Sequence, residues 1–116
     1  MPFVEITIFK KDKKKIKLVD SIVNSKICEN FKINKNLVTI YSNIIDKNNY
    51  YHDGIFQNKE KRIFIKIFGF KRNIIQKKKL ANALIEKLKK LLKISKAKNI
   101  AIYYFDLKKN DIFHGK

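Results

Sequence analysis

Apolar residues form two kinds of pattern along the chain. Some lie in short, mostly apolar runs, and others recur at helical spacing within longer stretches. The short runs are typical of strands and cover residues 3–9, 37–45, 62–70 and 99–107. The longer stretches cover residues 14–31 and 73–93, where apolar residues recur every three or four positions and lysines fill the other face. Between the halves, DKNNYYHDG at 46–54 is rich in turn formers and ends in an Asp-Gly turn signal. The pattern predicts the order β-α-β, β-α-β.

The two halves of the chain also resemble each other in sequence. FVEITIFKK at 3–11 aligns with FIKIFGFKR at 64–72 at a constant offset of 61 residues. The second strands align at an offset of 62, VTIYS at 38–42 with IAIYY at 100–104. The similarity predicts a duplicated βαβ unit.

A duplicated βαβ unit predicts an α+β fold in a single domain, residues 1–116, with units at about 2–46 and 61–107. A helix that crosses between paired strands makes them parallel, and such crossovers are right-handed. We therefore expect a four-stranded mixed sheet with two helices on one face. The other face keeps Phe, Ile and Tyr side chains, and further copies of the chain are expected to cover it.

The formal net charge of +18 changes the range of partners to consider. A basic surface is the usual footprint of a nucleic acid or an anionic membrane. Only Arg62 and Arg72 are arginines, however, and lysine lacks the fork that grips phosphate and guanine edges. Abundant Lys, Ile and Asn would also follow from AT-rich codons. Compositional bias and a functional anionic partner, a small anionic substrate included, both stay open.

Compartment and cofactors follow from what the sequence contains. The single cysteine, Cys28, excludes an internal disulfide and suits a reducing cytoplasm, where we place the protein. No run approaches the roughly 20 apolar residues of a membrane span, so no membrane association is expected. His52 and His114 stand alone, without the spacing of a metal site. We expect neither a metal nor a cofactor.

Pro2 directly follows Met1 at the head of the first predicted strand. A strand accepts proline at its first residue because proline has no N–H to donate, which is one explanation of its place. The other is chemical, since removal of Met1 would leave Pro2 with a free secondary amine. Burial and surrounding lysines lower the pKa of such an amine from its usual value of roughly 7.7–8.0. A base poised near the working pH can take a proton next to a carbonyl and return it elsewhere.

Several stretches carry a resemblance to a known family: MPFVEI at the start, NKNLVTIY (34–41), NYYHDG (49–54), FIKIFGFKR (64–72) and IYYFDLKKNDIFHGK (102–116). With the length and the tandem βαβ order, the chain resembles the tautomerase superfamily of 4-oxalocrotonate tautomerase and macrophage migration inhibitory factor, and most of all a small bacterial branch of it. The resemblance implies a homotrimer whose sheets form a central barrel. It also implies that the processed amino-terminal proline is the general base for keto–enol tautomerisation.

Candidate substrate-binding residues follow from the charge that the reaction creates, because a developing enolate needs cations or hydrogen-bond donors. Lys11 ends the first strand, Lys35 precedes the second, and Arg72 ends the third. In relatives, basic residues near these points hold the substrate carboxylate. This sequence departs from them by offering lysine at positions 11 and 35, and lysine lacks the fork for bidentate binding. Tyr103 falls near the place where relatives put a residue that faces the proline from a neighbouring subunit. The alternative for the basic residues is a solvated surface role without substrate, and the alternative for Tyr103 is packing within the strand.

Two other functions fit the same element order. The βαββαβ order is also that of the RNA-recognition motif, which presents aromatic residues on its sheet. The third strand departs from that motif, because Arg62 is followed by Ile63 where glycine is expected. Nucleic-acid binding is therefore expected to be weak and non-specific. The remaining alternative is a structural trimer of the same fold without catalysis.

Overall fold

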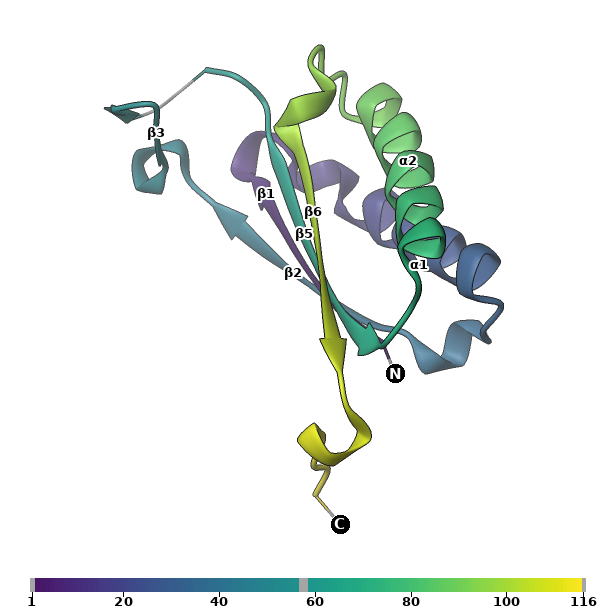
Figure 1. Ribbon diagram of the computed structural model, residues 1–116. Helices are drawn as coiled ribbons and strands as arrows, with labels where there is room; N and C mark the ends of the chain where they lie inside the picture. Colours follow the sequence, from purple (N-terminus) through teal and green to yellow (C-terminus); the bar gives the residue numbers. More distant parts are fainter. Residues whose placement is uncertain (1, 57–58, 116) are drawn as a thin grey trace.

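Two α-helices cover one face of a four-stranded sheet in the computed structural model, which describes residues 2–56 and 59–115 (Figure 1). The sheet consists of β1 (Phe3–Phe9), β2 (Thr39–Ile45), β5 (Ile63–Phe70) and β6 (Ile100–Leu107). The helices are α1 (Ile16–Phe31) and α2 (Ile74–Leu91). The predicted α+β fold, with a mixed sheet and both helices on one face, is confirmed.

The order of strands across the sheet is β2-β1-β5-β6. Each βαβ unit forms a parallel pair, and the central strands β1 and β5 are antiparallel. Phe3 lies opposite Thr39 in the first unit, and Phe64 lies opposite Ala101 in the second. These pairs correspond to each other at the offsets of the sequence alignment, 61 and 62 residues. The two units are therefore related by an approximate twofold axis.

This sheet differs from the one that an RNA-recognition motif requires. In the split βαβ arrangement of ferredoxin-like folds, another strand separates the two parallel strands of each unit. Here β1 lies directly beside β2, and β5 directly beside β6. The strand order of that alternative is therefore absent from this sheet.

The core lies between the sheet and the two helices. Alternate residues of the central strands point towards the helices, as a period of two requires. On the helices, buried residues recur every four positions and face the sheet. The buried residues that make this layer include Val4, Ile6, Ile8, Val19, Val23, Ile27, Ile63, Ile65, Ile67, Leu80, Leu84 and Leu88.

The ends of the elements are set by local chemistry. Asn73 caps α2, because its side chain accepts a hydrogen bond from the Gln76 N–H at 2.8 Å. The Gln76 side chain accepts in turn from the Asn73 N–H at 3.4 Å, which completes a capping box. A 3₁₀ turn, Lys10–Lys15, precedes α1, so the α-helix begins two residues after the predicted start at 14.

A small hairpin lies in the predicted turn region between the halves. It pairs β3 (Tyr51–His52) with β4 (Ile55–Phe56). Asp53 and Gly54, between them, have φ values of 54° and 75°. Two successive positive φ values are typical of a type I′ turn, which Asp-Gly favours. The turn is confirmed, and Figure 1 shows the hairpin projecting away from the helices.

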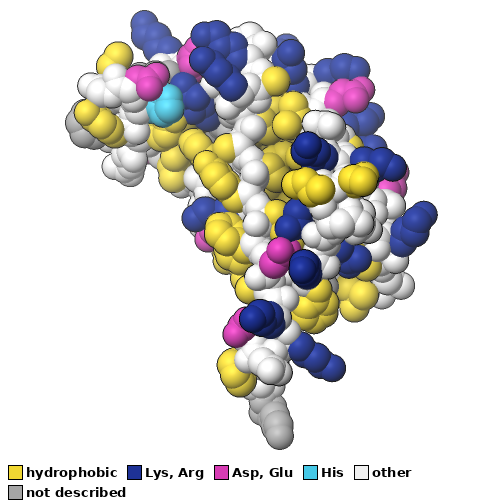
Figure 2. All heavy atoms as spheres, viewed as in Figure 1, with side chains coloured by type: hydrophobic (Ala, Val, Ile, Leu, Met, Phe, Trp, Pro, Cys, Tyr) yellow, Lys and Arg dark blue, Asp and Glu magenta, His cyan; other side chains and the backbone are white. Residues whose placement is uncertain are grey.

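The sheet face opposite the helices carries a ladder of aromatic rings, formed by Tyr41, Phe3, Phe68 and Phe105 from the four strands in order. Their centroids are 6.5, 4.5 and 4.7 Å apart and the rings are nearly parallel. In Figure 2, hydrophobic side chains follow the sheet towards the hairpin, whereas lysines and arginines are spread over the helices and loops. The aromatic ladder therefore lies on a face that no helix covers.

Candidate functional site

Pro2 is buried at the head of β1. Its carbonyl oxygen accepts a hydrogen bond from the Thr39 N–H at 3.1 Å, which ties it to β2. Gly69 is in β5, which lies between β1 and β6. A Cβ added to Gly69 would lie 3.1 Å from the Pro2 Cβ and 3.0 Å from the Tyr104 Oη. The missing side chain of Gly69 therefore lets the proline ring and a phenol approach the same strand. Met1, whose removal the chemistry needs, lies outside the described residues.

Tyr104 lies on the helix-facing side of β6, beside this proline. Its hydroxyl donates to the Phe70 carbonyl oxygen at 2.7 Å, and its ring makes an edge contact with Phe31, 5.9 Å between centroids. The ammonium of Lys77 lies 4.8 Å from the ring centroid. Burial raises the pKa of Tyr104, and the charge and hydrogen bond of Arg72 partly offset that rise. The phenol is therefore a neutral donor at physiological pH.

Arg72 follows the end of β5, which is the end nearest to Pro2 because β1 and β5 are antiparallel. Its guanidinium carbon lies 4.6 Å from the centroid of the Phe31 ring. The Nε of Arg72 is buried, with no hydrogen-bond partner among residues 2–56 and 59–115. A buried donor without a partner is costly, and an anionic oxygen placed beside it would satisfy it. Pro2, Tyr104 and Arg72 thus share one end of the sheet.

The other predicted site residues lie elsewhere in the chain. Lys35 is at the same end of the sheet as Pro2, in the 3₁₀ turn before β2, but it is exposed and borders a surface hollow along α1. Lys11 follows the far end of β1, so the strand separates it from Pro2. Tyr103 is exposed on the aromatic face, on the opposite side of β6 from Tyr104. A role for Lys11 or Tyr103 at Pro2 would need a neighbouring subunit.

The structure adds Gly69 and Tyr104 to the predicted residues, and the sequence held a signal for both. Glycine within a strand indicates a close approach of other groups. Ile100 and Ile102 alternate on the helix side of β6, so the period of two places Tyr104 with them. The family resemblance implied Tyr103 as the candidate site residue, whereas the alternation along β6 favours Tyr104.

Neither a metal centre nor a membrane segment is found in the described part of the chain. Within residues 2–56 and 59–115, no three His, Cys, Asp or Glu side chains are grouped to hold a metal ion. His52 lies on the hairpin, with its Nε2 3.3 Å from the Asp53 carboxylate. No helix in these residues is long and apolar enough to cross a membrane.

The phenol of Tyr104 gives a direct test of this geometry. We expect Tyr104 to ionise above pH 10, and Arg72→Gln to raise its pKa further, because Arg72 stabilises the phenolate. The raised pKa contributes stability that is fully present below about pH 10 and is lost as pH rises through that pKa. The ultraviolet titration curve of the wild type, with the curve of Tyr104→Phe subtracted, isolates the ionisation of Tyr104. Lys71→Gln, an exposed neighbour, is the matched control, and an equal shift there would contradict the proposed contact.

No family model and no curated protein matches the sequence. Solved structures do match: a fused 4-OT (4-oxalocrotonate tautomerase) symmetric trimer has a TM-score of 0.82 and 12% identity, covering 95% of this chain and 89% of that chain. FG41 malonate semialdehyde decarboxylase, inhibited by 3-bromopropiolate, has a TM-score of 0.80 and 15% identity. The match covers 98% of this chain and 89% of that chain. Pt0534, inactivated by 2-oxo-3-pentynoate, has a TM-score of 0.84 and 14% identity. The match covers 95% of this chain and 89% of that chain. The resemblance is confirmed at the level of the fold, and the chain has the fold of the tautomerase superfamily.

Proposed function

We propose that Pro2, freed by removal of Met1, is the general base and acid in the keto–enol tautomerisation of a small carboxylate-bearing carbonyl compound. The observation that best supports this role is the burial of Pro2 at the same end of the sheet as Arg72 and Tyr104. Burial disfavours the charged form of an amine and lowers its pKa towards neutrality. Such an amine takes a proton next to a carbonyl and returns it at the other end of the enol.

Arg72 is the residue that we propose holds the substrate carboxylate. Its buried Nε–H has no partner among the described residues, and its guanidinium lies over the Phe31 ring. A planar fork of donors matches a carboxylate in two parallel hydrogen bonds. Lys35 would add a second positive charge from the same end of the sheet. The Tyr104 hydroxyl, now bonded to the Phe70 carbonyl, is a neutral donor for the enolate oxygen.

We further propose that the chain assembles as a homotrimer through the aromatic face, in the cytoplasm. Tyr41 and Phe105, at the two edges of the ladder, are 47% and 42% exposed, and a soluble chain rarely leaves such a continuous apolar strip open to water. The fused 4-OT that matches this chain is itself a trimer. Association through this face would bring Tyr103 of one subunit to the surface of another, where the resemblance puts a residue near the proline.

The reactivity of the Pro2 amine tests the proposal. The matched structure of Pt0534 was inactivated by 2-oxo-3-pentynoate, a conjugated ynone that an amine attacks. The nitrogen bonds to the alkyne carbon β to the ketone, and a proton adds to the α carbon. We expect mass spectrometry of the Met-free protein to find one adduct per chain, in the amino-terminal peptide at Pro2.

Protein with a residue retained ahead of Pro2 is the control, because its Pro2 nitrogen is an amide without a free pair. It should stay unlabelled under the same conditions. Equal labelling of both preparations, or adducts spread over the lysines, would show that the reagent detects general amine reactivity and would contradict the proposal.

A further inference from the structure

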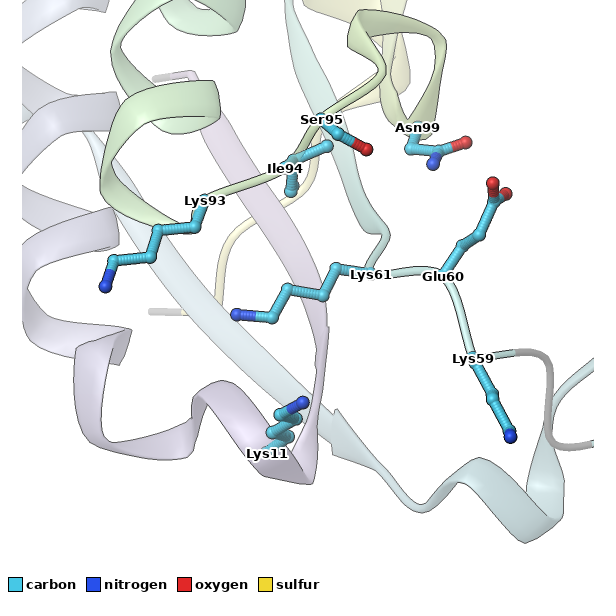
Figure 3. A pocket seen from close by; sticks show the side chains of 8 residues that line it. All are labelled: Lys11, Lys59, Glu60, Lys61, Lys93, Ile94, Ser95 and Asn99. Atoms are coloured by element: carbon cyan, nitrogen blue, oxygen red, sulfur yellow. The ribbon is translucent and has the colours of Figure 1, made fainter.

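A basic hollow lies at the opposite end of the sheet from Pro2. It measures about 350 Å³ and is bordered by residues of separate segments, among them Lys11, Lys61, Lys93 and Asn99. Lys11 comes from the turn after β1, Lys61 from the segment before β5, and Lys93 from the segment just after α2. In Figure 3 the side chain of Lys61 lies between that of Lys93, above and to the left, and that of Lys11, below.

A network of hydrogen bonds around the buried Arg62 holds one wall of this hollow in place. Arg62 is only 8% exposed, and it donates hydrogen bonds to Asn99 and, at 2.9 Å, to Glu60. Glu60 also accepts from Lys96 at 2.7 Å, and this bond is the main reason that its pKa is lowered. The one acidic side chain that borders the hollow is therefore already paired with two cations.

The lysines of the hollow differ in whether an acidic side chain balances their charge. Lys61 donates to the Leu92 carbonyl at 3.0 Å and lies 3.5 Å from the buried Asp12 carboxylate, so its amino group is fixed. Lys11 and Lys93 have no acidic partner among residues 2–56 and 59–115. Like charges that face one space repel each other, and a bound anion would remove that repulsion.

The approximate twofold axis relates this end of the sheet to the Pro2 end. Lys11 corresponds to Arg72 at the offset of 61, and Ile63 corresponds to Pro2. Ile63 is fully buried and offers no basic group. The second end thus keeps a cation in the place of Arg72 but has an aliphatic side chain in the place of Pro2.

We propose that this hollow binds a small dianionic oxyanion, inorganic phosphate or a phosphate monoester, without chemistry. Lysine binds phosphate as a point charge, and three lysines from three segments surround the ion without needing the fork of an arginine. The volume is at the lower end of the range for small-molecule sites, which suits a compact ion. The site is independent of Pro2 and of any tautomerase activity.

Calorimetric titration of the full chain with inorganic phosphate at low salt tests the site. We expect one ion per chain, with amide shifts in a ¹⁵N NMR titration centred on Lys11, Lys61 and residues 93–95. The double variant Lys11→Gln/Lys93→Gln should bind about tenfold more weakly, because two charges next to the ion are gone. Glycerol 3-phosphate, titrated in parallel, separates a preference for free phosphate from one for a monoester.

The matched control is Lys79→Gln/Lys109→Gln, which removes two exposed lysines far from the hollow in sequence. It should bind within about twofold of the wild type. The proposal is overturned if the control pair weakens binding as much as the site pair, or if the amide shifts spread along the lysines of α2. Tighter binding of a short RNA at that same place would assign the hollow to a nucleic acid and overturn it as well.

Discussion

Replacing Pro2 by alanine in the Met-free protein is expected to slow ketonisation of a phenylpyruvate-type enol by about 10²-fold or more, the size of a lost general base. Alanine leaves a primary amine, which no ring holds in the strand and which occupies a different position. The fold should survive, because position 2 needs only an extended residue whose carbonyl accepts from Thr39. The rate is measured from the decay of the enol absorbance, with the uncatalysed reaction subtracted.

The pair Arg72→Gln and Lys71→Gln serves as the internal comparison for this experiment. Arg72→Gln should raise the KM for the carboxylate-bearing enol, whereas Lys71→Gln, exposed at the adjacent position, should change little. A rate for Pro2→Ala equal to that of the wild type would leave Pro2 as no more than the first residue of a strand.

Replacing Phe68 by glutamate is expected to turn the proposed trimer into monomers. Phe68 lies at the centre of the ladder, 4.5 Å from the ring of Phe3 and 4.7 Å from that of Phe105. Burial of a carboxylate in an apolar interface is costly unless a cation pairs with it. Sedimentation at micromolar concentration should give a trimer for the wild type and a monomer for Phe68→Glu.

Leu18→Glu controls for the added charge, because Leu18 is 56% exposed on α1, in the helix layer. We expect this variant to remain trimeric. A monomeric wild type, or a Phe68→Glu protein that still forms trimers, would contradict assembly through the aromatic face.

The fold was largely predictable because hydrophobic periodicity and the internal repeat agree. The four strands and two helices lie where the apolar pattern put them, and the offsets of 61 and 62 reappear in the register. The hairpin strands were missed, since two residues are too short for any period to show. The second strand also begins two residues later than predicted, at Thr39, because residues 35–37 form a 3₁₀ turn.

The site was predictable only in part, because its geometry depends on pairing between distant strands. Antiparallel pairing of β1 and β5 places Arg72 at the Pro2 end and Lys11 at the other, although both follow strands that align in sequence. The separation of Lys11 from Pro2 follows from the predicted strand between them, whereas the place of Arg72 depends on the pairing of β1 with β5. The close approach of Tyr104 to Gly69 likewise depends on the register of β5 and β6, which no local pattern specifies.

The most direct test of the central claim compares two preparations that differ only at the amino terminus. One is Met-free, as verified by intact mass, and the other keeps a residue ahead of Pro2, so that the Pro2 nitrogen is an amide. The proposed mechanism predicts that the Met-free protein ketonises at least one small α-keto acid enol and that the extended protein does not. No ketonisation by the Met-free protein across several such enols, or equal rates for both preparations, would contradict it.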